Sequence, residues 1–179
     1  MSLLPPQSSG THTYCKVGKL TPYGAAEIGD MRIAPYKPKK LYLMGSLRNP
    51  KVSELAAKIR TIGYDVFDDW MAAGPVADDC WRDYERQRGR QYKAALEGHA
   101  ANHVFSHDKH HLDTSDVGVL FLPAGKSAHL ELGYFLGCGK PGFIYMEEEP
   151  ERYDVMYKFA TGIFFSDTEL LEALKTLNR

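Results

Sequence analysis

Short, mainly apolar runs alternate with longer amphipathic segments from Lys39 to the end of the chain. Apolar runs bounded by glycine, proline or polar residues predict buried β-strands, and segments with a helical period predict helices. We predict five strands, at Leu41–Met44, Tyr64–Phe67, Val117–Leu122, Phe143–Met146 and Gly162–Phe165. Strands that are apolar throughout are typical of a parallel sheet covered by helices on both faces.

The segments between these strands carry helix signals at their ends. The first predicted helix starts at Asn49-Pro50 and stops at Gly63, and two more lie between Ala77 and about His111, with a break near Gly98. A fourth follows Pro123-Ala124-Gly125 and runs to Leu136. The last starts with the capping box Ser166-Asp167-Thr168-Glu169. The alternation of strands and helices therefore predicts an α/β fold. Five strands favour the flavodoxin-like (Rossmann-like) order 2-1-3-4-5.

Composition divides the chain into two parts. Residues 1–38 are rich in proline, glycine, serine and threonine and show no periodicity, which predicts an N-terminal extension that is loosely ordered or draped over a neighbouring surface. Residues 39–179 form one domain of ordinary globular composition. A net charge of -1 and a pI near 6.6 argue against a dedicated nucleic-acid binder.

The sequence also lacks the signals of secretion and of membrane insertion. Its first residues have neither a basic nor an apolar signal-peptide region, and no apolar run approaches the roughly 20 residues that cross a bilayer. The three cysteines, Cys15, Cys80 and Cys138, show no CxxC spacing, which favours reduced thiols. We therefore expect a soluble cytoplasmic protein that has no membrane partner.

Two loops of the predicted sheet carry candidate chemistry. In the order 2-1-3-4-5, the connections after the first and third strands leave on opposite faces, and ligands bind in the crevice between them. Gly45-Ser46-Leu47-Arg48 follows the first strand, and Gly125 to Glu131 follows the third. Glycine allows close approach of the backbone, while serine, arginine and a helix N-terminus can bind an anion. A plain strand-to-helix turn with an exposed arginine is the alternative interpretation.

Glu131 is the candidate reactive carboxylate. It lies one turn into a predicted helix, among small or apolar neighbours, and Gly133 leaves room for another element to pack closely. A helix N-terminus favours the ionised carboxylate, which suits a nucleophile. Lys126 and Ser127 add groups to the same crevice that can donate hydrogen bonds to an anion. The alternative is an ordinary surface glutamate on an amphipathic helix.

Several other residues have competing interpretations. Asp108 is positioned to reach the crevice from the side, or it is an ordinary helix cap, which the residues alone favour. Asp69 and Trp70 follow the second strand, where the tryptophan is a candidate wall for a planar base and equally a core residue. Four histidines recur every fourth residue, at His99, His103, His107 and His111. On a helix, each step of four residues turns the side-chain direction by roughly 40°. One straight helix cannot bring four such ligands to one ion, so we predict no metal site.

At these residues the sequence resembles the nucleoside 2-deoxyribosyltransferase family, including its 2'-deoxynucleoside 5'-monophosphate N-glycosidase branch. The resemblance covers roughly residues 39–145 and rests on three features. These are Leu41-Tyr42-Leu43-Met44-Gly45-Ser46-Leu47-Arg48, the eight-residue spacing between Asp108 and Asp116, and Ser127-Ala128-His129-Leu130-Glu131-Leu132-Gly133.

The resemblance implies a catalytic domain over residues 39–179 that cleaves the N-glycosidic bond of a nucleoside or nucleotide. It implies that Glu131 forms a glycosyl ester, that Asp108 protonates the departing base, and that Tyr42 positions the glutamate. It places the 5'-phosphate on Gly45, Ser46 and Arg48, as in the hydrolase branch. Transfer of the sugar to another base or to water decides between transferase and hydrolase.

The resemblance further implies a small-molecule substrate, no cofactor and a homo-oligomer, a dimer or larger, formed through the Glu131 helix and the histidine-bearing segment. The chain departs from the family at Gly125, where the branches tend to have aspartate or serine, and in the long segment from Ala73 to His103, which corresponds to the base pocket. Two alternatives stay open. One is cleavage of the nicotinamide–ribose bond of NAD, and the other is a catalytically silent nucleotide-sensing module.

Overall fold

The computed structural model describes residues 38–178, and the predicted N-terminal extension, apart from Pro38, lies outside them. The described chain contains a five-stranded, all-parallel sheet in the order β2-β1-β3-β4-β5. The strands are β1 (Lys40–Met44), β2 (Asp65–Phe67), β3 (Val117–Phe121), β4 (Gly142–Tyr145) and β5 (Gly162–Phe164). Both the α/β class and the strand order predicted from the sequence are confirmed.

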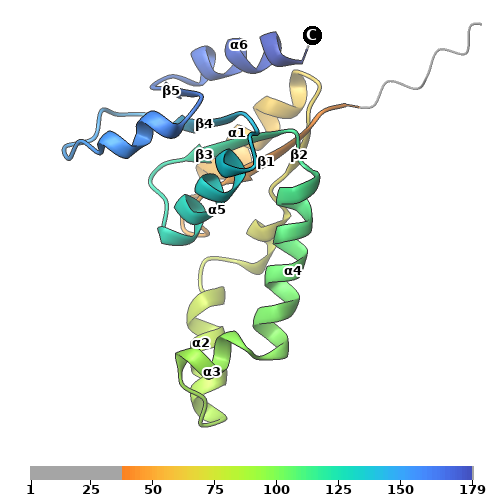
Figure 1. Ribbon diagram of the computed structural model, residues 1–179, viewed down its shortest axis with the longest axis vertical. Helices are drawn as coiled ribbons and strands as arrows, with labels where there is room; N and C mark the ends of the chain where they lie inside the picture. The colour runs from red at the N-terminus through yellow and green to blue at the C-terminus, as the bar shows by residue number, and fades with distance from the viewer. Residues whose placement is uncertain (1–37, 179) are drawn as a thin grey trace, which may run out of the picture. The chain divides into compact units, whose positions relative to one another are not determined.

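Helices cover both faces of this sheet (Figure 1). The α-helices are α1 (Lys51–Thr61), α2 (Ala77–Gln87), α3 (Tyr92–Leu96), α4 (His99–Thr114), α5 (Lys126–Gly137) and α6 (Asp167–Leu177), and the 3-10 helices are η1 (Asp69–Ala73) and η2 (Val155–Phe159). One face packs against α1 and α6, and the other packs against α4 and α5. The helices α2 and α3 lie beyond the sheet, near the N-terminal end of α4 (Figure 1).

The number of predicted α-helices was correct except in the segment between Ala77 and Gly98. The chain breaks near Gly98, as predicted, but the stretch before it forms two helices rather than one. The turn between α2 and α3 contains Gly89 at φ 70°, a left-handed conformation that favours glycine. At α6, Ser166 Oγ accepts a hydrogen bond from the Glu169 N–H at 3.2 Å, which confirms Ser166 as the N-cap, the first half of the predicted capping box.

The C-terminal half of α4 is anchored to the sheet through His111. The His111 ring stacks on Phe67 of β2 at a centroid distance of 3.8 Å, and its Nδ1 lies 2.7 Å from Lys40 Nζ. Burial lowers the pKa of His111, and the nearby charge of Lys40 lowers it further. A neutral imidazole therefore accepts the lysine hydrogen bond, and this contact fixes the helix that carries Asp108.

Lys140 closes the C-terminal end of α4. Its ammonium group donates to the backbone carbonyls of Leu112, Asp113 and Ser115 at 3.2, 2.6 and 2.8 Å. The Leu112 carbonyl also accepts a hydrogen bond from the Ser115 N–H at 3.4 Å, but the last carbonyls of a helix lack their usual amide partners four residues on, so a cation is favoured there. We expect Lys140→Met to lower the free energy of unfolding by about 1–2 kcal/mol, measured by urea denaturation.

Lys175→Met is the matched control, because Lys175 forms an exposed pair with Glu172 on one helix. An exposed pair of this kind contributes less than about 0.5 kcal/mol. Equal losses in the two variants would show that the ammonium at the end of α4 has no special role.

Candidate active site

The alternation of β1 places Tyr42 on the face of the sheet that α4 and α5 cover. Leu41 and Leu43 belong to the core beneath α1 and α6, whereas Tyr42 and Met44 belong to the opposite core. The Tyr42 side chain is 1% exposed, and its ring packs against Phe67 at a centroid distance of 5.0 Å. Residues from α4 and α5 are thereby brought to the tyrosine.

Asp108 on α4 and Glu131 on α5 both act electrostatically on Tyr42. Burial raises the pKa of Tyr42 far above its ordinary value, and the charges of Glu131 and then Asp108 raise it further. The phenol therefore keeps its proton and can donate a hydrogen bond. Tyr42 and Asp108 are 66 positions apart in the sequence, and Asp108 and Glu131 are 23 positions apart. The fold nevertheless brings the three side chains close enough to interact electrostatically.

Glu131 is the more strongly perturbed carboxyl group. Burial raises its pKa to about 7, and the charge of Asp108 contributes to the rise. Burial also raises the pKa of Asp108, and the adjacent His107 opposes that rise. Both side chains are half-buried. Two neighbouring carboxyls whose pKa values are both raised are typical of a catalytic acid–base pair.

The turn after β1 and the turn after β3 line one hollow. A cavity of about 190 Å³ lies between Ser46, Arg48 and Asn49 on one side and Pro123 and Ala124 on the other. This is the crevice between adjacent strands whose connections leave on opposite faces, the position at which such sheets bind ligands. The structure therefore places the predicted Gly45–Arg48 segment beside the segment that leads into α5.

Within this turn, the conformation is set by local contacts. Ser46 Oγ accepts a hydrogen bond from the Arg48 N–H at 3.2 Å, and the exposed Arg48 side chain pairs with Asp79 of α2 at 3.1 Å. A Cβ atom on Gly45 would lie 2.8 Å from Val52 Cγ2. Close packing against α1 therefore explains this glycine without a ligand.

The start of α5 is open. Lys126 and Ser127 are exposed in its first turn, and a Cβ atom on Gly125 would have open space around it. Gly133 is also exposed with open space, so within residues 38–178 no other element packs on it. On the same helix, Leu130 is 75% exposed and Tyr134 is exposed.

The two candidate base-pocket residues lie in different environments. Trp70 is half-buried, packs against both cores and donates its indole N–H to the Leu43 carbonyl at 2.9 Å. Asp69 is exposed, and its charge acts on His111 of α4. Trp70 thus ties η1 to the end of β1, and a role for either residue in base recognition stays a prediction.

A contact that the sequence did not predict links the start of α5 to η2. His129 Nδ1 lies 2.8 Å from the Gly125 carbonyl, and His129 Nε2 lies 2.9 Å from the Tyr157 hydroxyl. Because a carbonyl only accepts, Nδ1 carries the proton, and in neutral histidine the tyrosine hydroxyl donates to Nε2. No sequence signal near Tyr157 connects it with a residue 28 positions earlier.

Two further properties concern the described residues only. Among residues 38–178, no three histidine, cysteine, aspartate or glutamate side chains are grouped so as to hold a metal ion. Within the same range, every helix is too short or too polar to span a membrane.

Comparisons with known proteins give the class of fold. The chain resembles the solved structure of a 2-deoxyribosyltransferase from Bacillus psychrosaccharolyticus, with a TM-score of 0.51 and 17% identity over 74% of this chain and 90% of that one. It also resembles a CMP N-glycosidase from Clostridium botulinum, with a TM-score of 0.44 and 16% identity over 76% of this chain and 98% of that one. No protein-family model matches the chain, and no curated protein matches its sequence. The described domain thus shares the fold of the first enzyme, which confirms the predicted resemblance at the level of the fold.

Proposed function

We propose that the protein cleaves the N-glycosidic bond of a nucleoside or nucleoside 5'-monophosphate and passes the sugar to water or to another base. The observation that carries the proposal is the buried Tyr42 beside two carboxyls with raised pKa values, one of them Glu131 at about 7. The position of this group, near the crevice between β1 and β3, supports the proposal, as does the fold shared with a 2-deoxyribosyltransferase.

In the proposed reaction, a carboxylate oxygen of Glu131 attacks the anomeric carbon. The bond from that carbon to the base nitrogen breaks, its electron pair goes to the base, and Asp108 gives its proton to the base. The acceptor, water or a second base, then attacks the same carbon while Asp108 takes its proton, and the ester bond to Glu131 breaks. The pair needs one proton in total. Because the pKa of Glu131 is the more strongly raised, this proton must pass from Glu131 to Asp108 before the first bond breaks.

Tyr42 has a positioning role in this proposal. Its phenol stays protonated, so its hydroxyl can donate a hydrogen bond to one of the two carboxylates whose charges act on it. No residue within 38–178 hydrogen bonds to the Glu131 carboxylate, which leaves its oxygens available to a substrate. A donor that orients one oxygen favours attack by the other.

The crevice between the two turns is proposed as the phosphate site. Ser46, Arg48 and the exposed Lys126 and Ser127 provide hydroxyl and cationic groups, and the N-terminal end of α5 provides free N–H groups. A homo-oligomer is also proposed. The open outer face of α5, with the exposed Leu130 and Tyr134, supports it.

A substrate panel tests the function and the phosphate site together. Purine and pyrimidine nucleosides, their 5'-monophosphates and NAD are each incubated with and without an acceptor base, and free and exchanged bases are separated by chromatography. We expect Arg48→Met to raise KM for a monophosphate by roughly 10- to 100-fold, because a charged hydrogen bond to phosphate is lost. KM for the corresponding nucleoside should stay unchanged.

Asp79→Asn is the control for this variant, since it removes the ion-pair partner of Arg48 but keeps the guanidinium group. It should leave KM for the monophosphate unchanged or lower it. A parallel rise of KM for nucleoside and monophosphate in Arg48→Met would exclude a phosphate contact. Release of nicotinamide from NAD without release of any nucleobase would favour the alternative reaction.

A further inference from the structure

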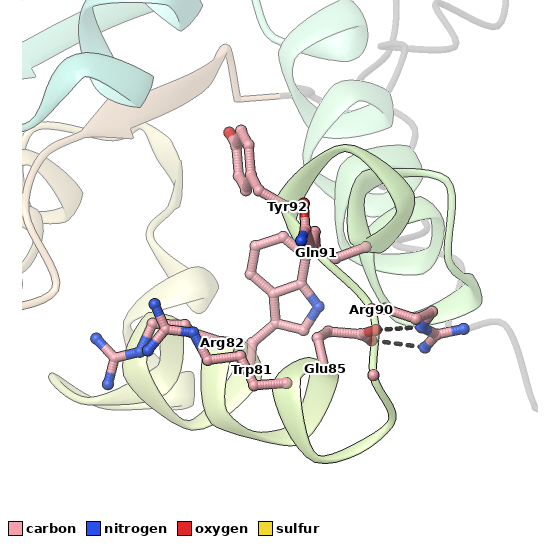
Figure 2. A pocket seen from close by; sticks show the side chains of 9 residues that line it. Trp81, Arg82, Glu85, Arg90, Gln91 and Tyr92 are labelled. Carbon is pink, nitrogen blue, oxygen red and sulfur yellow. Dashed lines mark hydrogen bonds and ion pairs between the residues drawn. The ribbon is translucent and has the colours of Figure 1, made fainter.

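A second and larger cavity lies between α2, α3 and the turn that joins them. Its volume is about 610 Å³, within the range of about 300–1,000 Å³ that is typical of small-molecule sites. Its lining includes Trp81, Tyr92, Arg82 and Arg90, which Figure 2 labels, and also Arg86. None of the residues proposed for catalysis lines it, so the proposed function leaves this cavity unexplained.

One wall of the cavity is held by a buried ion pair. Glu85 is 2% exposed and accepts hydrogen bonds from Arg90 Nε and, at 2.8 Å, from Arg90 Nη2 (Figure 2). The Arg90 N–H also donates to the Glu85 carbonyl at 3.0 Å, so backbone and side chain together close the turn. Arg90 neutralises Glu85, and this wall therefore adds rigidity to the cavity but no net charge.

On the other side of the cavity, one of two arginine side chains is paired and the other is not, among the described residues. Arg82 lies on α2 and bonds to Asp79 and Asp83, both at 2.8 Å. The side chain of Arg86, one turn further along α2, makes no hydrogen bond or ion pair within residues 38–178, although its charge acts on Asp83. An unpaired guanidinium group at the edge of a cavity is a ready partner for phosphate, which it binds through two parallel hydrogen bonds.

The aromatic part of the cavity suits a planar ring. Trp81 is half-buried, and its ring centroid lies 6.5 Å from that of Tyr92 at an interplanar angle of 67°. Tyr92 is 72% exposed, so its ring has space to turn and admit a ligand against the indole. The indole Nε1 is buried near Glu85 but has no hydrogen bond of normal geometry among the described residues. Gln91 adds an amide to the same lining (Figure 2).

We propose that this cavity is a second ligand site and that it binds a nucleoside 5'-monophosphate. The base stacks on Trp81 and Tyr92, and the phosphate binds Arg86 with help from Arg82. Stacking on aromatic side chains tolerates any base, whereas the two guanidinium groups select for the anion. The site does not depend on the proposed catalytic function, because it shares no residue with the crevice.

Tryptophan fluorescence tests this site directly. The chain has two tryptophans, so Trp70→Phe leaves Trp81 as the only indole. In this background, with Glu131→Gln added to prevent turnover, a nucleoside 5'-monophosphate should quench the emission in a saturable manner. The corresponding nucleoside should quench it only at a concentration roughly tenfold higher or more, because it lacks the charged group. Inorganic phosphate should not quench it.

Two pairs of variants in α2, α3 and the turn between them distinguish loss of binding at this cavity from general effects on the fold. Arg86→Ala should raise Kd for the monophosphate roughly tenfold or more, whereas Arg88→Ala should not, since Arg88 bonds to the Tyr84 hydroxyl and does not line the cavity. Likewise, Tyr92→Ala should weaken binding about tenfold, whereas Tyr84→Ala should not. Absence of saturable quenching up to millimolar concentration would overturn the proposal, as would equal effects in either pair.

Calorimetric titration of the chain that carries only Glu131→Gln keeps the two proposals apart. Two monophosphate sites per chain are expected, of which Arg86→Ala removes one and Arg48→Met weakens the other. A single site that depends on Arg86 would support the second site while contradicting the phosphate crevice. A single site that depends on Arg48 would support the crevice and overturn the second site.

Discussion

Glu131→Gln is expected to reduce the release of free base by about 10⁴-fold or more, because the amide cannot form the glycosyl ester. The substitution is nearly isosteric and removes one of two neighbouring carboxyls, so the fold should be retained. Base release is measured by chromatography with the substrate that reacts fastest in the panel. Thermal unfolding of the same sample shows whether the variant is folded.

The nucleophilic role has a second readout besides the rate. Acid quenching of the wild-type protein during turnover should give a chain whose mass is increased by one glycosyl group, located by peptide mapping on Glu131. The ester should be absent in Glu131→Gln. Glu54→Gln, a change of an exposed glutamate on α1, is the matched control and should keep full activity. Undiminished base release by Glu131→Gln would exclude the glutamate as the nucleophile.

Asp108→Asn is expected to lower kcat/KM by roughly 10²- to 10⁴-fold for bases that must be protonated as they leave. The loss should be much smaller for a nucleoside whose base is N-alkylated and already cationic, because that base leaves without a proton. This contrast distinguishes a proton donor from a residue that only supports the fold, which would affect both substrates equally. An equal loss for both would contradict the assignment.

The pH profile of the same variant gives an independent test. In the wild-type protein the reactive form carries one proton on the carboxyl pair, so kcat/KM should fall on both the acid and the alkaline side. Asp108 raises the pKa of Glu131, and loss of its negative charge in Asp108→Asn favours the ionised glutamate. In Asp108→Asn the alkaline limb, which reflects loss of the pair's single proton, should therefore disappear, and the remaining acid limb, set by Glu131 alone, should lie below pH 7. An unchanged profile would show that the two carboxyls are not coupled.

The arrangement of the fold was largely predictable from local patterns. Apolar runs such as Leu41–Met44 and Val117–Phe121 identify buried parallel strands, because only a sheet covered on both faces accommodates strands without polar alternation. Capping residues fixed the start of α6, and the alternation of strands and helices gave the strand order that the structure confirms. The division of the segment after Ala77 was missed, since its charged residues have no periodicity that separates α2 from α3.

The candidate site was predictable only in part. The sequence identified Tyr42, Asp108 and Glu131 through a family resemblance and placed two turns at one edge of the sheet. It could not give the burial of the carboxyls, on which the pKa of Glu131 depends, because burial results from how α4 and α5 pack on β1. The sequence also could not show whether Gly45 is needed for close approach of a ligand or for packing inside the protein. The structure shows that packing against Val52 explains this glycine.

The sequence by itself determined the fold class and the strand order, since these depend on periodicity, and it suggested the candidate catalytic residues through short motifs that resemble those of a known family. Only the tertiary structure decided which groups meet across long separations. Arg48 meets Asp79, His129 meets Tyr157, and His111 stacks on Phe67. The cavity between α2 and α3 likewise exists only once Arg90 turns back to Glu85. Such contacts depend on the packing of side chains from separate elements, which local sequence patterns do not encode.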